Sequence, residues 1–174
     1  LNDLDIKYSL STIRADNYED VENEIKSNNY THVVDCIGRT YGTINDKPEY
    51  SATKFLEQNL DINIKDNLIS HINICLCITK YNMHYTSFSS GCLYNNKLTD
   101  LLTETNAFRE NDLPNYKENS YFIMKSHAEK ILMNINPNIL ILRIRLTLSK
   151  IDNPKNFICK YIKYDKINNI PNSF

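Results

Sequence analysis

Tyr121 and Lys125 are the residues in this sequence whose types and spacing best suit proton transfer. They stand four positions apart in NSYFIMKSHAEKIL, residues 119–132, which has a helical pattern, so both side chains would lie on one helical face. An ammonium group there would stabilise a phenolate and lower the tyrosine pKa from its ordinary value of about 10. Taken alone, however, this spacing is common on ordinary helix surfaces, so its meaning depends on the elements around it.

Short apolar segments alternate with helical patterns along the chain. Near-continuous apolar strands between helices predict a parallel sheet covered on both faces. The expected fold is therefore α/β, with a doubly wound, Rossmann-like sheet. We expect strands at 31–38, 83–91 and 138–146, a polar loop at 95–118, and helices at 17–29, 53–80, 119–134 and 153–166.

The carboxyl edge of that sheet is the expected binding site, because ligands of open parallel sheets bind beyond the carboxyl ends of the strands. The loop 95–118 would fold over the same edge. Ser90, at the end of a predicted strand, would support a catalytic reading of the tyrosine–lysine pair. Three segments should face one crevice there: Gly38-Arg39-Thr40, Ser89-Ser90-Gly91-Cys92 and Arg145-Leu146-Thr147.

Composition limits the classes of function. The 174 residues are enough for one domain, and a formal net charge of -1 with a pI near 6.5 gives no electrostatic case for nucleic-acid or membrane binding. No apolar run approaches the roughly 20 residues of a membrane helix, and no signal peptide is evident. Neither the five cysteines nor the four histidines have a metal-ligand spacing. We expect a cytoplasmic, reducing setting and a site without metal.

A glycine-rich phosphate-binding loop does not occur in these residues, which include only three glycines. Doubly wound nucleotide-binding domains open with a strand, that loop and a helix. This chain enters at a point resembling the second strand, IKYSLSTIRAD at residues 6–16. We therefore expect the middle of a larger enzyme, without the first strand–loop–helix unit.

The order of several motifs resembles the extended short-chain dehydrogenase/reductases. More narrowly, it resembles the UDP-4-keto-6-deoxyglucose 3,5-epimerase/4-reductases of UDP-rhamnose synthesis, which are related to the dTDP-4-dehydrorhamnose reductases. The resemblance runs from about residue 10 to the last residue. It implies that residues 1–174 form a partial NAD(P)-binding Rossmann-like domain that stops before the family's remaining C-terminal substrate-binding segment. The motifs are VVDCIG (33–38), DN (66–67), SSGCLY (89–94), YFIMK (121–125), LRIRL (142–146), NPKNFICK (153–160) and IPNS (170–173).

The resemblance implies roles for residues at matching positions. Tyr121 and Lys125 would be the reductase pair, with Ser90 as the hydroxyl beside them. Cys92 and Lys160 would serve epimerisation, with the lysine charge giving the thiol its thiolate character. Family and fold position together suggest two sets of binding residues. The cofactor, NADPH or NADH, would contact Gly38, Arg39, Thr40, Asn67, Tyr121, Lys125 and Arg14, and the sugar would contact Ser90, Gly91, Cys92, Asn156 and Lys160.

Two local geometries are also predicted. If the strand continued past Ser90, the Cys92 side chain would point the same way as the serine. Arg143 and Arg145 alternate with apolar residues on a strand predicted to be buried. One of these arginines would meet a carboxylate or a ligand phosphate, unless it lies at an exposed strand end.

The leading functional hypothesis is a 3,5-epimerase/4-keto-reductase that converts a UDP-4-keto-6-deoxyhexose to a UDP-L-rhamnose-type sugar with NADPH. One alternative is a 4-keto-reductase alone, which would not need Cys92 and Lys160. Another is a non-catalytic remnant kept as an interaction domain. The sequence leaves open whether the sugar carries a 2-hydroxyl or a 2-acetamido group, and a homodimer through helices 53–80 and 119–134 is only a default.

Overall fold

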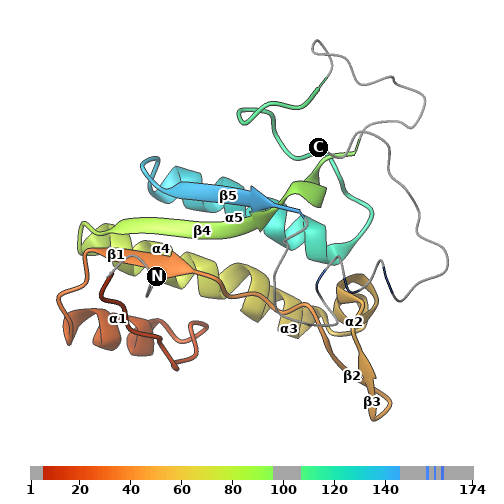
Figure 1. Cartoon of the computed structure of the whole chain (residues 1–174), viewed down its shortest axis with the longest axis horizontal. Coiled ribbons are helices and arrows are strands. Elements are labelled where there is room, and N and C mark those ends of the chain that lie inside the picture. The colour runs from red at the N-terminus through yellow and green to blue at the C-terminus, as the bar shows by residue number, and fades with distance from the viewer. Residues whose placement is uncertain (1–5, 96–106, 146–155, 157–158, 160–161, 163–174) are drawn as a thin grey trace.

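Helices and strands alternate along the chain, as the sequence predicts (Figure 1). The computed structural model describes residues 6–95, 107–145, 156, 159 and 162. No helix in this part of the chain is long and apolar enough to cross a membrane. The elements are α1 (Tyr18–Lys26), β1 (His32–Asp35), β2 (Gly42–Ile44), β3 (Lys47–Glu49), α2 (Ala52–Gln58), α3 (Leu60–Ile64), a π-helical segment (Lys65–Ile69), α4 (Ser70–Lys80), β4 (His84–Ser90), a 3₁₀ turn (Gly91–Leu93), α5 (Ser120–Ile135) and β5 (Leu140–Ile144).

β1, β4 and β5 form a parallel sheet in that order. At the carboxyl ends, Asp35 lies opposite Ser87, and Ser90 lies opposite Ile144. Helices connect the strands, so all three strands run the same way and end at one edge. The predicted Rossmann-like parallel sheet is confirmed, and each of its three strands lies inside its predicted range.

Side-chain caps fix where the helices begin. Asn17 accepts a hydrogen bond from Glu19 N at 3.0 Å ahead of α1, and Asn119 accepts one from Phe122 N at 3.2 Å ahead of α5. Each cap satisfies a backbone N–H that the helix itself leaves without a partner. The cap of α5 matters for chemistry because it places Tyr121 in the first turn of that helix.

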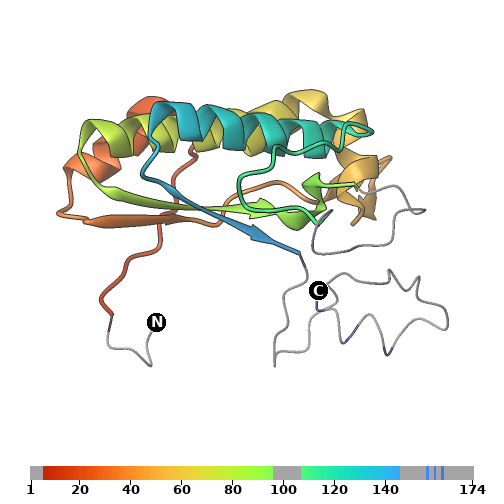
Figure 2. The ribbon, with the colours of Figure 1, turned by 90° about the horizontal axis from the view of Figure 1, so that it is seen from above.

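The hydrophobic core lies between the sheet and α1, α4 and α5, which form one layer above it (Figure 2). Cys75 and Cys77 are buried free thiols, and they pack as small apolar side chains. Tyr85 of β4 joins this core and is 1% exposed. The core cluster consists of Val21, Ile25, Ile74, Cys75, Cys77, Ile78, Tyr85 and Leu132.

The other face of the sheet exposes apolar side chains. Val34 of β1 is 59% exposed, and Leu140, Leu142 and Ile144 of β5 are 45%, 36% and 41% exposed. The prediction that β1 and β5 are buried is wrong for these residues. The reason is visible in Figure 2, where the described helices pack on the opposite face. The expected covering of both faces is therefore met on one face only within the described residues.

A β-hairpin made of β2 and β3 is missing from the sequence prediction. Its turn residues Asn45 and Asp46 have positive φ angles of 50° and 61°. Two consecutive positive φ angles are typical of the type I′ turns that join hairpin strands. The Asn-Asp pair between two short β-branched or extended stretches was the available signal.

Residues 6–16 are predicted to form a strand, and this prediction is wrong for the structure, in which no strand is assigned there. A strand requires a ladder of backbone hydrogen bonds to a neighbour. Here side chains make the contacts instead: Ser9 Oγ donates to Tyr30 Oη at 2.7 Å, and Ser11 Oγ donates to Glu24 Oε2 at 2.6 Å.

The predicted helix 53–80 is helical throughout except at Asn59, which separates α2 from α3. The Asn59 side chain donates to Phe55 O at 2.8 Å, an example of an asparagine that satisfies the end of a helix. The π-helical segment before α4 widens the helix locally, a feature often found at functional sites. Predicted helices 17–29 and 119–134 are confirmed as α1 and α5; most of predicted helix 153–166 lies outside the described residues.

Arg143 of β5 meets a carboxylate, as the sequence predicts. Its Nη2 lies 2.8 Å from Glu129 Oε2 on α5, and its Nη1 donates to Glu110 O at 2.8 Å. The guanidinium also lies over the Tyr94 ring, 5.2 Å from the centroid. This arginine therefore ties β5, α5 and the loop before α5 together.

Replacing Leu132 by alanine should lower the free energy of unfolding by about 2–5 kcal/mol, because the side chain is 2% exposed and its loss leaves a cavity in the core. The neighbouring Met133 is 54% exposed, so Met133→Ala on the same helix should change it by less than about 0.5 kcal/mol. Urea denaturation followed by circular dichroism measures both. Equal losses would contradict the assigned core.

Candidate active site

Lys125 is buried at the carboxyl edge of the sheet, where its side chain is 5% exposed. Its Nζ lies 3.0 Å from His71 Nε2 of α4 and 3.4 Å from Phe88 O of β4. Gly38, just after β1, has a φ of 147°, and a Cβ atom there would lie 3.3 Å from the same Nζ. The amine thus sits where β1, β4 and α4 come together.

Asp35 is the carboxylate behind this lysine, at the end of β1. Its Oδ2 contacts His71 Nδ1 and accepts a hydrogen bond from Tyr85 Oη at 2.6 Å. Burial opposes the charge of Asp35, but the hydrogen bonds from His71 and Tyr85 outweigh it and lower the pKa of this carboxyl. Burial also lowers the pKa of Lys125, against the opposing attraction of Asp35 and Glu129. A buried positive and a buried negative group are therefore linked through one imidazole.

Tyr121 lies in the first turn of α5, close to Cys92. Burial raises the pKa of the Tyr121 phenol, and the charge of a Cys92 thiolate raises it further. The direction is opposite to the one predicted from the tyrosine–lysine spacing. The reason is geometric: the Lys125 amine turns toward His71 and the end of the sheet.

β4 ends at Ser90, and the chain then forms the 3₁₀ turn. Ser90 Oγ accepts a hydrogen bond from Cys92 N at 3.1 Å and so caps that turn. Because the strand ends at Ser90, the condition for the predicted common direction of the Ser90 and Cys92 side chains is not met. The turn nevertheless brings Cys92 near Tyr121, so serine, cysteine and tyrosine meet at one edge.

The described part of the predicted loop 95–118 folds against the residues that follow β4. Leu93 O accepts hydrogen bonds from Asn115 N at 3.2 Å and Tyr116 N at 3.0 Å. Asn95 N donates to Asn115 Oδ1 at 2.8 Å, and Asn115 Nδ2 returns a bond to Asn95 O at 3.0 Å. The prediction that this loop packs on the carboxyl edge is confirmed for these residues.

Asn67 fastens the loop after β1. Its Oδ1 accepts from Arg39 N at 3.0 Å, and its Nδ2 donates to Arg39 O at 3.1 Å, so one amide satisfies both backbone groups. Nδ2 also donates to Asn63 Oδ1 at 3.0 Å, and Asn63 Nδ2 donates to Ser120 Oγ at 3.1 Å. This chain of amides links the loop to the start of α5, next to Tyr121.

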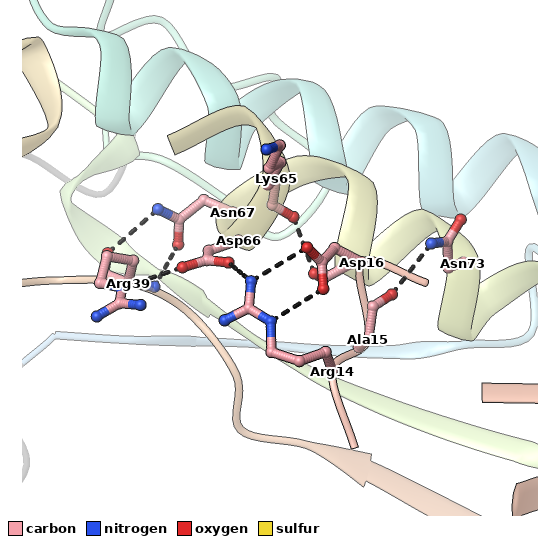
Figure 3. Close-up of polar contacts among 9 residues, drawn as sticks. Arg14, Ala15, Asp16, Arg39, Lys65, Asp66, Asn67 and Asn73 are labelled. Carbon is pink, nitrogen blue, oxygen red and sulfur yellow. Dashed lines mark hydrogen bonds and ion pairs between the residues drawn. The ribbon is translucent and has the colours of Figure 1, made fainter. Parts of the chain in front are cut away.

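Arg14 and Arg39, far apart in sequence, meet at Asp66 (Figure 3). Arg14 Nη2 lies 2.7 Å from Asp66 Oδ1, and Arg39 Nε lies 3.0 Å from Asp66 Oδ2. Arg14 also pairs with Asp16, at 3.0 Å. The Arg14 side chain is 60% exposed, and that of Arg39 is 36% exposed. Two accessible cations therefore lie together beside the loop that follows β1.

The remaining predicted residues are placed as follows. Thr40 is half-buried and directly follows Arg39, whose backbone Asn67 holds. A Cβ atom on Gly91 would lie 3.5 Å from Arg145 Cβ, so the ends of β4 and β5 adjoin as expected. Asn156 is 6% exposed. Lys160 lies outside the described residues, as do Leu146 and Thr147 of the expected crevice.

A small cavity of about 10 Å³ lies beside Lys125, between the sheet and α5. Ser89 helps to line it, and the buried Ser89 Oγ has no hydrogen-bond partner among the described residues. This volume is about that needed by one water molecule, which would supply the missing partner. The cavity is therefore suited to a bound water and far too small for a sugar.

Asp35, His71 and Asn63 were not predicted to belong to the site. Asp35 carried a signal, because an acid within the otherwise apolar run VVDCIG must find partners if that strand is buried. Asn63 and His71 each stand four residues from Asn67, on the same helical face. Three polar residues at that spacing in an apolar helical pattern indicate a buried polar network.

A mimivirus protein resembles the chain in both sequence and structure. The chain is 35% identical to it over 162 residues, which are 92% of this chain and 54% of the Acanthamoeba polyphaga mimivirus protein. A crystal structure from the same virus, described as a UDP-rhamnose synthase, superposes with a TM-score of 0.79 at 33% identity, over 90% of this chain and 53% of that one. No family model matches the chain.

Plant and bacterial proteins are similar at greater distance. A bifunctional dTDP-4-dehydrorhamnose 3,5-epimerase/reductase of Arabidopsis thaliana is 25% identical over 97% of this chain and 53% of its own length. A dTDP-4-dehydrorhamnose reductase of Bacillus anthracis, crystallised with NADP, shares the fold with a TM-score of 0.72 at 16% identity, over 94% of this chain and 52% of that one. The chain spans about half the length of these relatives. The similarities confirm the resemblance indicated by the motif order.

Gly38→Ala should lower the free energy of unfolding by about 1–3 kcal/mol, because a φ of 147° strains any residue with a Cβ. The new methyl group would also press on Asn67 Oδ1, at 3.1 Å, and on the Lys125 amine. Gly91→Ala is the matched control, since its Cβ would make only an ordinary contact at 3.5 Å and should cost less than about 0.5 kcal/mol. Thermal and urea unfolding measure both; equal stability of the two variants would refute the special role of Gly38.

Proposed function

We propose that this chain, a relative of the nucleotide-sugar epimerases and reductases of the extended short-chain dehydrogenase/reductase family, carries catalytic residues of a 3,5-epimerase/4-keto-reductase. The substrate is a UDP-4-keto-6-deoxyhexose, the product is a UDP-L-rhamnose-type sugar, and the reductant is NADPH. The observation that supports this most is that Ser90 and Cys92 stand at the carboxyl end of β4, with Lys125 bound to the same strand at Phe88 O and Tyr121 within electrostatic reach of Cys92.

Reduction at C4 requires a hydride on carbon and a proton on oxygen. Tyr121 gives the proton to the emerging alkoxide, and Ser90 donates a hydrogen bond to the same oxygen. Burial raises the pKa of Tyr121, which keeps the phenol protonated and ready to donate at neutral pH. Lys125 is held close to the loop after β1, where it would contact the ribose of a bound coenzyme.

Epimerisation at C3 and C5 requires removal of a proton next to the C4 ketone and its return to the opposite face of the ring. Cys92 and Lys160 form the acid–base pair for this exchange. Tyr121 and Ser90 stabilise the enolate oxygen, so both reactions use the same hydrogen-bond donors. The proximity of Cys92 to Tyr121 supports this shared arrangement.

Two features of the described residues fit a bound dinucleotide, which when bound supplies the hydride. Arg14 and Arg39 place two accessible guanidinium groups beside the loop after β1, where the N–H groups not bound to Asp16 or Asp66 could donate to phosphate oxygens. An arginine in this region suits the 2′-phosphate that distinguishes NADPH from NADH. We assign Gly38, Thr40 and the backbone of Arg39, which Asn67 holds, to coenzyme binding, and Gly91 and Asn156 to sugar binding.

The setting of the enzyme is part of the proposal. The described cysteines are all free thiols, which supports a reducing, cytoplasmic environment. Pairing of two copies into a homodimer is proposed from the family resemblance.

The first prediction concerns proton exchange at the sugar. The complete gene product, incubated in deuterated water with UDP-4-keto-6-deoxyglucose and without NADPH, should introduce deuterium at C3 and C5. Cys92→Ala should abolish this exchange while still reducing a sugar that is already epimerised, because Tyr121 and Ser90 remain. NMR of the sugar measures the deuterium, and NADPH oxidation measures the reduction.

Cys36→Ala is the control for that experiment, because Cys36 is an exposed free thiol just after β1 to which the proposed reaction gives no role. It should exchange at the native rate. Full exchange by Cys92→Ala would exclude this thiol from the epimerisation. No exchange by the native protein, together with NADPH oxidation on the epimerised sugar, would leave a 4-keto-reductase only. If the native protein shows no exchange and no reduction, the proposed function is wrong.

The second prediction concerns the proton donor. Tyr121→Phe should lower kcat for reduction of the epimerised sugar by about 10²–10⁴-fold, since a positioned general acid contributes that much. Tyr81, at the end of α4, donates a hydrogen bond to Glu22 of α1. Tyr81→Phe removes only this hydrogen bond and should leave kcat unchanged. Stopped-flow measurement of NADPH oxidation distinguishes them, and a similar small effect of both would exclude Tyr121 as the acid.

A further inference from the structure

Asp35, His71 and Lys125 form a continuous buried chain. The reaction proposed above uses Lys125 and gives no role to Asp35 or His71. The three residues are 2%, 1% and 5% exposed and come from β1, α4 and α5. Asp35 Oδ2 contacts His71 Nδ1, and Lys125 Nζ lies 3.0 Å from His71 Nε2. The imidazole therefore stands directly between a carboxylate and an amine.

The carboxylate decides which nitrogen of His71 carries the proton. An ionised Asp35 only accepts hydrogen bonds, so His71 Nδ1 must hold a hydrogen and donate it. In the neutral ring, Nε2 then carries a lone pair and can accept a hydrogen bond from the Lys125 ammonium. The other tautomer would direct N–H toward an ammonium that has no acceptor. The geometry thus matches a charged lysine, a neutral histidine and a charged aspartate.

The other charged groups around Lys125 do not replace Asp35. Glu129, one turn further along α5, is paired with Arg143 of β5 at 2.8 Å. β4 contributes Phe88 O and the hydroxyls of Ser87 and Ser89, the π-helical segment contributes the amide of Asn67, and Tyr121 lies one turn earlier on α5.

Asp35 itself has no cation in direct contact among the described residues unless His71 is charged. Its other hydrogen bonds come from Tyr85 Oη at 2.6 Å, Ser87 Oγ at 3.4 Å and Ile37 N at 2.8 Å. Asp35 is therefore the counter-charge of Lys125, and His71 is the connection between them.

We propose that Asp35 and His71 are positioning residues that hold the Lys125 amine charged and fixed beside Gly38, which is the state that the proposed reductase function requires of it. His71 supplies the acceptor, and Asp35 keeps His71 in the accepting tautomer. An ammonium buried to this extent without an acceptor would lose its proton or leave the site. Asp35 and His71, together called the dyad, prevent both outcomes, because they give the amine a directed hydrogen bond and a nearby negative charge.

The test compares variants of the complete gene product labelled with [ε-¹³C]lysine. The Lys125 signal is identified by its loss in Lys125→Arg, and its titration is followed by NMR without substrate or coenzyme. In His71→Leu this titration should move to lower pH, because the ammonium loses its nearer acceptor and keeps only the Phe88 carbonyl at 3.4 Å. His71→Gln returns an acceptor oxygen near the position of Nε2 and should restore most of the native titration.

Tyr85→Phe is the matched control. It removes one hydrogen bond to Asp35 but leaves the contact between His71 and Lys125, so the Lys125 titration should stay as in the native protein. If His71→Leu does not fold, His71→Asn carries the same expectation, because its shorter amide can still reach Asp35 but not Lys125. An unchanged titration in the histidine variants, or an equal shift in Tyr85→Phe, would overturn the proposal.

Kinetics give a second readout. In His71→Leu, kcat for reduction should fall about ten- to a hundredfold at neutral pH, in line with the loss of a hydrogen bond to a charged group. Activity should recover as the pH is lowered, since protonation of Lys125 is then restored; a loss that is equal at every pH would indicate structural damage and count against the proposal. If the native protein reduces no nucleotide sugar but the Lys125 titration moves in His71→Leu, the proposed function is wrong and the role of Asp35 and His71 stands.

Discussion

Burial of the Lys125 ammonium is the constraint around which much of this structure is arranged. A positive charge that is 5% exposed must be given acceptors, because burial removes most of its contact with bulk water. The end of β4 offers a carbonyl, α4 offers an imidazole, and β1 offers the carboxylate behind that imidazole. Each of these groups lies at the carboxyl edge of the sheet or on the helix that packs over it. The strand order β1-β4-β5 brings the first two strands together at this point.

The same constraint explains why the helix-facing side of β4 is unusual. A strand beneath a helical layer normally presents apolar side chains, yet here Tyr85, Ser87 and Ser89 alternate on that side and are buried. Two of them donate to Asp35, and the third lines the small cavity beside Lys125. The polar face of β4 thus buries less apolar surface than an ordinary strand would. In exchange, it stabilises the charges at the site.

The sequence predicted the elements better than the contacts. The strands and the helices α1 and α5 follow from apolar periodicity, which burial of one face enforces directly. Tyr121 and Ser90 were predicted because residue type and position at element ends are local features. The partners of Lys125 were not, because they depend on side-chain directions across three elements. The amine was expected to face Tyr121, and the structure turns it toward His71. The hairpin was missed for a different reason, since an Asn-Asp turn is a weaker signal than Asn-Gly.

The clamp that Asn67 places on Arg39 restricts which chemical changes the site can tolerate. A carboxamide offers a donating nitrogen and an accepting oxygen, and here it mimics a peptide unit laid against the chain. Aspartate has the same shape but two acceptors, so hydrolysis of this amide would set a carboxylate oxygen against Arg39 O. Leucine has the same branching but neither group. Slow deamidation, a normal part of protein ageing, would therefore damage the loop after β1 through the loss of one hydrogen-bond donor, without any change in side-chain size.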